Sequence, residues 1–110
     1  MNGNYKLVIY KMVTGKEPFT EWFQSLSDEK TRAVVGQRLS RVERGNFGII
    51  RNVGNSVYEF KINFGPGYRI YFSYVSKNTV VILKAGSKRS QAQDILAAQF
   101  YREDHFRRLV

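Results

Sequence analysis

The chain has 110 residues, which suits one domain (residues 1–110), and its 43% hydrophobic and 15% aromatic content excludes a disordered chain. It lacks cysteine, a bilayer-spanning apolar run and a signal-peptide pattern, which excludes disulfides and thiolate metal sites and leads us to expect a cytoplasmic protein without a membrane partner. The formal net charge of +9 favours a polyanionic partner, because phosphate contacts release counterions.

The first half of the chain predicts one strand and two helices. Residues 5–10 alternate as in a strand, and Pro18 suits the first position of a helix. Ser27 is predicted to cap a second helix, which ends at Gly45 in the manner of a left-handed C-terminal cap. We expect the two helices to form an antiparallel hairpin with a basic outer surface.

The second predicted helix has an apolar stripe and a basic side. The stripe contains Val35, Leu39 and Val42. Four arginines lie largely off it, namely Arg32, Arg38, Arg41 and Arg44.

The second half of the chain predicts mostly sheet. Strands are expected at residues 49–53, 57–64, 68–75 and 79–85, the last of them apolar enough to be covered on both faces. Ser90 and Gln93 predict a capping box for a C-terminal helix. The order βααββββα indicates an α+β layer structure.

The Gly65-Pro66-Gly67 turn predicts a hairpin with one polar face. A turn centred on Pro66 places Lys61 opposite Tyr71 and Asn63 opposite Arg69. The apolar side should pack against the helices. The polar side, expected to form either a solvated face or a binding surface, contains Glu59, Lys61, Asn63, Arg69, Tyr71 and Ser73.

Positive charge is concentrated in the middle of the chain. Residues 30–89 contain 12 Lys or Arg and two acidic residues, Glu43 and Glu59. The loop of residues 85–90 carries Lys88 and Arg89 ahead of a helix N-terminus, a place that attracts phosphate. A merely soluble surface or an acidic protein partner would also account for the charge. His105 is interpreted as a solvated helix residue.

These residues could cleave RNA without histidine, metal or cofactor. The 2′-hydroxyl of RNA is a built-in nucleophile, so the protein has mainly to orient the backbone and stabilise charge. Arg69 suits the phosphate oxygens, and Lys88 or Arg89 could neutralise the leaving oxygen. The general base that removes the 2′ proton could be either Glu59 or Lys61. The hypothesis requires that these cations share one surface and that Arg69 is not locked in a structural ion pair.

The run from Tyr58 to Ile62, followed by Gly-Pro-Gly-Tyr-Arg-Ile-Tyr-Phe at residues 65–72, resembles the hallmark of HigB-like toxins, the addiction-module killer proteins of the RelE/ParE superfamily. Residues 19–23, 38–48 and 86–95 fit the same family, so the resemblance covers nearly the whole chain. It implies a RelE-like fold with a helical hairpin against a twisted antiparallel sheet.

The resemblance also implies a function. HigB-like toxins cleave mRNA in the ribosomal A site without metal. A co-expressed antitoxin, commonly a helix-turn-helix protein of the HigA type, neutralises them and brings the complex to operator DNA. By position, Arg69 matches the phosphate-binding arginine, Lys61 a catalytic lysine or arginine, and Lys88 and Arg89 a further basic catalytic residue. The chain differs from many relatives in having Ser87 where they carry an acidic residue.

We expect RNA contacts from four further side chains: Tyr71, Arg38, Arg41 and Arg44. Two alternatives to a ribosome-dependent endoribonuclease remain at this stage. One is a ParE-like inhibitor that poisons DNA gyrase by binding. The other is a nucleic-acid-binding module that has lost turnover.

Overall fold

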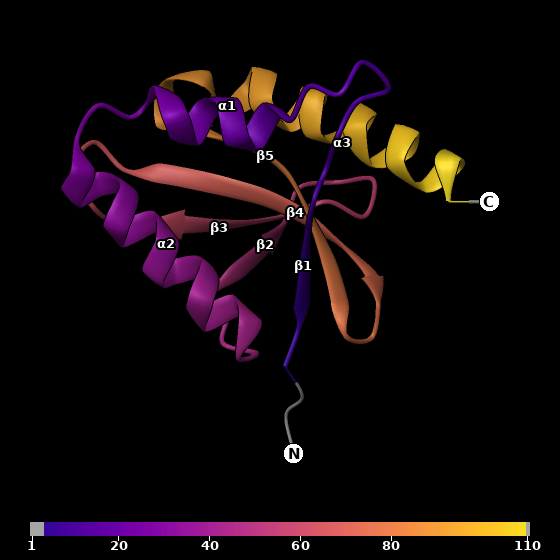
Figure 1. Cartoon of the computed structure of the whole chain (residues 1–110), viewed down its shortest axis with the longest axis horizontal. Coiled ribbons are helices and arrows are strands. Elements are labelled where there is room, and N and C mark those ends of the chain that lie inside the picture. Colours follow the sequence, from indigo (N-terminus) through magenta and orange to yellow (C-terminus); the bar gives the residue numbers. More distant parts are fainter. Residues whose placement is uncertain (1–3, 110) are drawn as a thin grey trace.

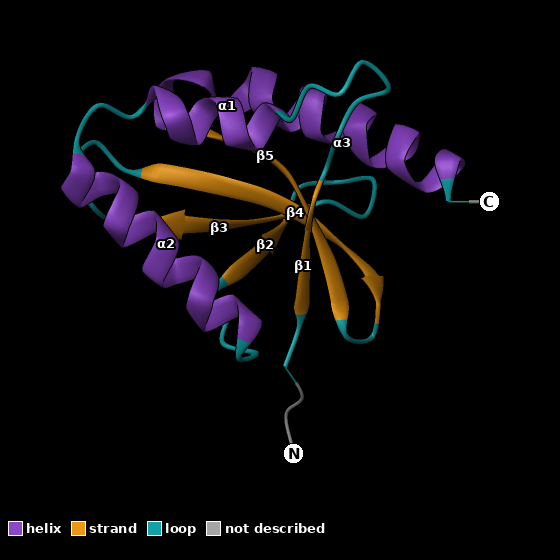
Figure 2. Ribbon diagram, in the orientation of Figure 1, coloured by secondary structure: helices purple, strands orange, loops and turns teal. Residues whose placement is uncertain are grey.

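The computed structural model describes residues 4–109 (Figures 1 and 2). Its elements are β1 (Lys6–Ile9), α1 (Pro18–Ser25), α2 (Glu29–Glu43), β2 (Ile50–Asn52), β3 (Tyr58–Ile62), β4 (Tyr68–Ser76), β5 (Thr79–Ser87), the one-turn 3-10 helix η1 (Lys88–Ser90) and α3 (Gln91–Arg108). This order confirms the predicted α+β fold. No helix within residues 4–109 is long and apolar enough to cross a membrane.

The five strands form one sheet in the order β1-β5-β4-β3-β2. Strands β2 to β5 pair antiparallel, whereas β1 runs parallel to β5. The predicted antiparallel sheet is therefore mixed, because the chain between β1 and β5 is long enough to return to the same end of the sheet. Strand β5 lies inside the sheet and is buried on both faces, as its apolar sequence predicted.

Helices α1 and α2 cover one face of the sheet. Phe19 of α1 and Val35 and Val42 of α2 join the core on which Phe60 and Phe72 of the sheet also pack. The two helices diverge from their short link and do not lie side by side (Figure 1). The predicted antiparallel hairpin is therefore wrong, since each helix buries its apolar stripe against the sheet and not against the other helix.

Helix α3 covers part of the opposite face and creates a second core. Tyr71 is fully buried there with Leu83 of β5 and Ala98 of α3. Ser73 is also buried, and its hydroxyl donates to the carbonyl of Ser56 at 2.8 Å. The predicted polar face of the β3–β4 hairpin is therefore not open at Tyr71 and Ser73, because α3 closes over this part of the sheet.

The β3–β4 hairpin has a different register from the predicted one. Lys61 pairs with Arg69 and Glu59 with Tyr71, because the loop is centred on Gly65 and not on Pro66. Gly65 and Gly67 both adopt positive φ (59° and 86°), which glycine allows without strain. The shift of two residues leaves every side chain on its predicted face.

Two of the predicted helix caps are replaced by other contacts. Asp28, and not Ser27, caps α2 by accepting a hydrogen bond from the Lys30 amide. Ser90 makes no capping bond, since η1 precedes α3 and the Ser90 hydroxyl donates to Asp94 at 2.6 Å. The predicted C-terminal cap of α2 is confirmed by Gly45, which has a φ of 89°.

Candidate functional site

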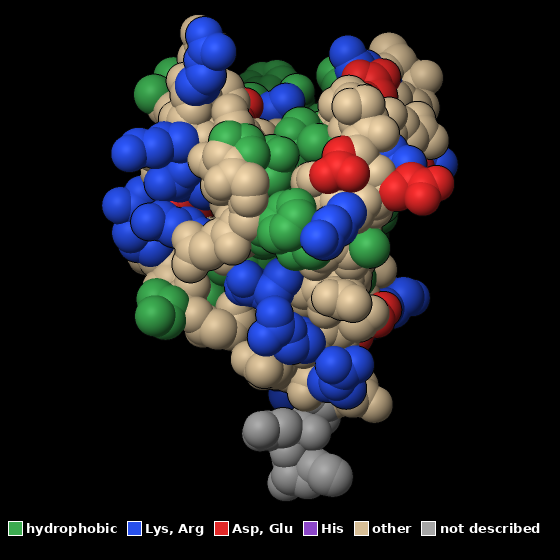
Figure 3. All heavy atoms as spheres, turned by 90° about the vertical axis from the view of Figure 1, so that its left-hand side faces the viewer, with side chains coloured by type: hydrophobic (Ala, Val, Ile, Leu, Met, Phe, Trp, Pro, Cys, Tyr) green, Lys and Arg blue, Asp and Glu red, His purple; other side chains and the backbone are tan. Residues whose placement is uncertain are grey.

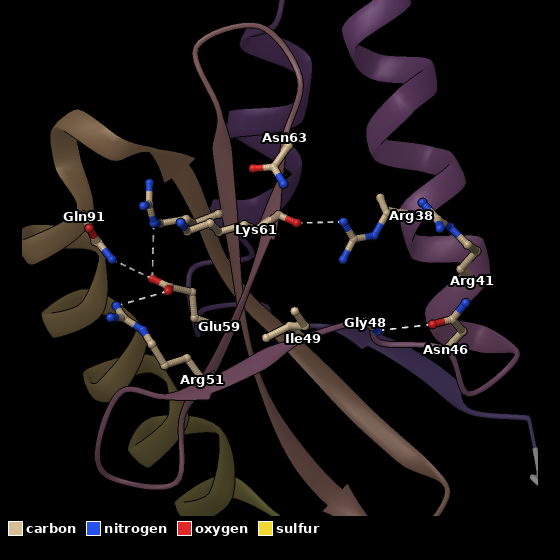
Figure 4. A pocket seen from close by; sticks show the side chains of 11 residues that line it. Arg38, Arg41, Asn46, Gly48, Ile49, Arg51, Glu59, Lys61, Asn63 and Gln91 are labelled. Atoms are coloured by element: carbon tan, nitrogen blue, oxygen red, sulfur yellow. Dashed lines mark hydrogen bonds and ion pairs between the residues drawn. The ribbon is translucent and has the colours of Figure 1, made fainter.

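The sheet and α2 enclose a pocket of about 610 Å³, called here the basic pocket. Its floor contains Lys61 of β3 and Arg69 of β4, which are paired neighbours in the sheet. Five cationic side chains and a single carboxylate line the pocket, with Arg51 beside Glu59 and with Arg38 and Arg41 across the pocket on α2 (Figure 4). The lining residues are Arg38, Arg41, Asn46, Gly48, Ile49, Arg51, Glu59, Lys61, Asn63, Arg69 and Gln91.

Glu59 is the anchor of the pocket floor. Its side chain is 2% exposed and lies 3.2 Å from Arg51 and 3.6 Å from Arg69. It also accepts a hydrogen bond of 2.9 Å from the side chain of Gln91, at the start of α3. Both carboxylate oxygens are thus engaged, an arrangement that orients the cations and counts against Glu59 as the general base.

Arg69 is buried but reaches the basic pocket. Its Nε atom lies 3.6 Å from Glu59 Oε2 and has no hydrogen-bond partner within the described residues. The requirement that Arg69 be free of structural ion pairs is therefore not fully met. The pair is longer than a hydrogen bond, and the side chain still lines the pocket wall.

Arg38 joins α2 to the pocket floor. It donates to the carbonyl of Lys61 at 2.7 Å and to that of Phe47 at 3.3 Å, and its guanidinium lies 4.7 Å from the centre of the Phe60 ring. Burial, and then the charge of Arg41, lowers the pKa of Arg38 from its ordinary value. Arg38 lines the pocket as predicted, yet much of its donor capacity holds the protein itself together.

Lys61 and Arg41 are the most available cations of the pocket. Both are exposed, and none of the ion pairs found in residues 4–109 involves either of them or Arg38. Figure 3, which views the molecule from the side of α2, shows Lys and Arg side chains gathered with few acidic ones between them. Unneutralised charge of this kind attracts phosphate.

Lys88 and Arg89 lie beside the pocket and not in its wall. They occupy η1 and are exposed, while Gly86 and Ser87 just before them pair with Arg69 and Tyr68 of β4. The prediction that this loop lies near the cationic strands is confirmed. A Cβ on Gly86 would come within 2.0 Å of Asp94 Oδ2, so α3 can approach the sheet closely only over a glycine.

The remaining predicted residues lie away from the basic pocket. Tyr71 is buried beneath α3, so the expectation that it contacts RNA from the surface is wrong. Burial, and then the charges of Glu59 and Asp94, raises the pKa of its hydroxyl. Arg44 lines a neighbouring shallow groove together with Arg41. His105 is half-buried against Tyr10 and not solvated as predicted, and burial lowers its pKa.

Five lining residues were missed by the sequence analysis, namely Asn46, Gly48, Ile49, Arg51 and Gln91. Arg51 reaches Glu59 because β2 pairs with β3, and Gln91 does so because α3 folds back over the sheet. Neither contact has a local sequence signal. Within residues 4–109, no His, Asp and Glu side chains are grouped so as to hold a metal ion.

Comparisons with known proteins agree with this architecture. Residues 21–104 match the family described as "Phage derived protein Gp49-like (DUF891)". An uncharacterised protein of Haemophilus influenzae is 31% identical over 86 residues, which cover 78% of this chain and 87% of that protein. The free state of a mutant of the E. coli toxin RelE superposes with a TM-score of 0.64 at 18% identity, covering 90% of this chain and 97% of the other.

Proposed function

The chain belongs to the Gp49-like family of phage-derived proteins and has the fold of the E. coli toxin RelE, and from this premise we propose that it is the toxin of a type II toxin–antitoxin system, of the HigB-like kind. Its proposed activity is cleavage of mRNA in the ribosomal A site without a metal ion. The observation that carries the proposal is that, among residues 4–109, five cations and only one carboxylate line the basic pocket.

The proposed reaction is attack of a ribose 2′-oxygen on the adjacent phosphorus. The bond from phosphorus to the 5′-oxygen breaks, which leaves a 2′,3′-cyclic phosphate and a 5′-hydroxyl. Arg69 would bind the non-bridging oxygens, whose added charge in the transition state favours a fixed guanidinium. Lys61, acting as the neutral amine, is the better candidate to accept the 2′ proton, because it lies in the pocket without an ion-pair partner among the described residues, whereas both oxygens of Glu59 are engaged.

Basic residues outside the pocket floor complete the proposed site. Lys88 or Arg89, on the neighbouring 3-10 turn, would neutralise the charge on the departing 5′-oxygen, which takes its proton from Lys88 or from water. Arg41 on α2 and Arg44 just after its end, both exposed, would hold phosphates of the flanking RNA. Arg38 would act mainly by positioning Lys61, since it holds the carbonyl of that residue.

The proposed partners follow from the toxin assignment. They are the ribosome with its mRNA, and an antitoxin with a helix-turn-helix domain through which the complex would reach operator DNA. We further propose that residues 1–110 form one toxin domain that acts in the cytoplasm.

A second candidate is a nucleic-acid-binding module without turnover. The pairing of Arg69 with Glu59 favours it, because a committed arginine stabilises developing charge less well than a free one. Such a protein would bind RNA, with an affinity that falls as the salt concentration rises, but would leave the RNA intact.

Induction of the wild type and of Arg69→Ala in bacteria, with growth followed and mRNA ends mapped, separates these functions. The toxin proposal predicts growth arrest with mRNA breaks at codon positions, and relief in the variant. Arrest with intact transcripts and damaged DNA would favour gyrase poisoning, and intact transcripts without arrest would favour the binding module. Lys77→Ala, an exposed turn residue outside the pocket, is the control and should arrest growth like the wild type.

A further inference from the structure

Ile49 is an apolar residue in a charged setting. Among the described residues that line the basic pocket, it is the one with an apolar side chain. It is 92% exposed, so it adds little to the hydrophobic core. Figure 4 shows it between the group around Glu59 on one side and Arg38 and Arg41 of α2 on the other.

The backbone on both sides of Ile49 is held in place. Gly48 adopts a φ of 69° and donates its amide hydrogen to Asn46 Oδ1 at 3.2 Å. The carbonyl of Phe47 accepts a hydrogen bond from Arg38, and Ile50 pairs with Phe60 in the sheet. The exposed side chain is therefore presented from a fixed loop beside the cations.

A nucleotide matches this combination of groups. Its phosphate is anionic, and its base has a flat apolar face that is free to pack when the RNA is single-stranded. A phosphate held at Lys61 or Arg69 leaves the adjoining base next to Ile49, since all three residues line one pocket. Covering Ile49 removes apolar surface from water, which favours binding. An apolar protein segment fits less well, because it would leave the surrounding cations without counter-charge.

We propose that Ile49 packs against the nucleobase next to the phosphate bound in the basic pocket, and so helps to select the nucleotide. This inference rests on the proposed function, because it takes RNA as the ligand. Ile49 touches the base and not the reacting atoms, so it contributes to binding and cut-site preference and leaves the chemical step to Lys61 and Arg69.

The test compares wild type and Ile49→Ala with two uncleavable probes by fluorescence anisotropy. One probe is a short single-stranded 2′-O-methyl RNA, and the other is the same backbone with every base removed. We expect Ile49→Ala to weaken binding of the base-bearing probe about fivefold and to leave binding of the abasic probe unchanged. Val13→Ala, a change at a valine that is 80% exposed and outside the pocket, should affect neither probe.

Equal binding of the base-bearing probe by wild type and Ile49→Ala would overturn the inference. So would a loss of the same size on both probes, because that would indicate a disturbed phosphate site. Weaker capture of a cognate antitoxin by Ile49→Ala with unchanged RNA binding would likewise overturn it and assign Ile49 to a protein interface. Failure of the proposed function is seen separately, as wild-type protein that binds the probe but cuts no ribosome-bound mRNA.

Discussion

Two carboxylates in this molecule are each held by two arginines and one neutral donor. Glu59 is bound by Arg51, Arg69 and Gln91 in the floor of the basic pocket. Asp104 is bound by Arg107, Arg108 and the hydroxyl of Tyr10, and joins the end of α3 to the end of β1. The two clusters look alike when only their contacts are considered.

The surroundings of the two carboxylates differ. Around Glu59, Lys61 and the arginines of α2 add positive charge that Glu59 does not balance, and a pocket opens onto them. Around Asp104, Arg108 also donates to the carbonyl of Lys11 at 2.5 Å, so the donors are used within the protein. The comparison teaches that unneutralised charge facing a pocket marks the candidate site, whereas an arginine–carboxylate cluster alone does not.

The largest expected effect comes from removing the anchor of the basic pocket. Glu59→Ala leaves Arg69 buried without its counter-charge, and loss of one partner of a buried pair costs about 3 kcal/mol of unfolding free energy. Asp104→Ala should cost less, because its partners Arg107 and Arg108 are largely exposed. Urea unfolding of both variants measures the difference. Equal losses would show that the two clusters are equivalent in stability.

Removing an unpaired pocket cation should affect activity and not stability. Lys61→Ala is expected to lower mRNA cleavage about 10²-fold, the usual effect of losing one group that acts in the transition state. Lys77→Ala removes another exposed lysine, outside the pocket, and should change the cleavage rate little. Similar rates for the two variants would contradict the assignment of the basic pocket as the site.

The close approach of α3 to the sheet can be tested at a glycine. Gly86→Ala places a Cβ against Asp94 and should cost about 2 kcal/mol of stability, the usual effect of overpacking. Gly36→Ala lies in α2 with no atom near its Cβ and should raise stability by about 0.5 kcal/mol. Thermal unfolding gives both values. A neutral Gly86→Ala would mean that α3 can move away from the floor of the site without cost.

The smallest effect is expected at Asp104 and depends on pH. The Tyr10 hydroxyl, and then Arg108, lowers the pKa of Asp104 below its ordinary value of 3.8. The folded-state pKa lies below the unfolded one, so this stability is present above pH 3.8 and is lost as the pH falls through the folded pKa. Asp104→Asn should therefore flatten the acid side of a stability–pH curve. An unchanged acid slope in the variant would contradict the assignment.

The sequence predicted the element order, the faces of the β3–β4 hairpin and the place of the loop that carries Lys88 and Arg89. The predicted register of the hairpin was wrong by two residues, because the loop is centred on Gly65. The predicted faces were still right, since a shift by an even number of residues keeps each side chain on the same face. The burial of Tyr71 and the contacts of Arg51 and Gln91 could not be predicted in this way. They depend on how α3 and β2 pack against the rest of the sheet. The hydrophobic pattern within one segment does not indicate which distant segment it will contact.

The central claim is that the cations of the basic pocket act on a phosphodiester of ribosome-bound mRNA. The most direct measurement incubates purified protein with mRNA on ribosomes, and with the same mRNA alone, and analyses the new ends. The account predicts cuts that require the ribosome, that leave a 2′,3′-cyclic phosphate and a 5′-hydroxyl, and that are lost in Lys61→Ala and Arg69→Ala. Intact mRNA on the ribosome, or equal cutting by wild type and both variants, would contradict it.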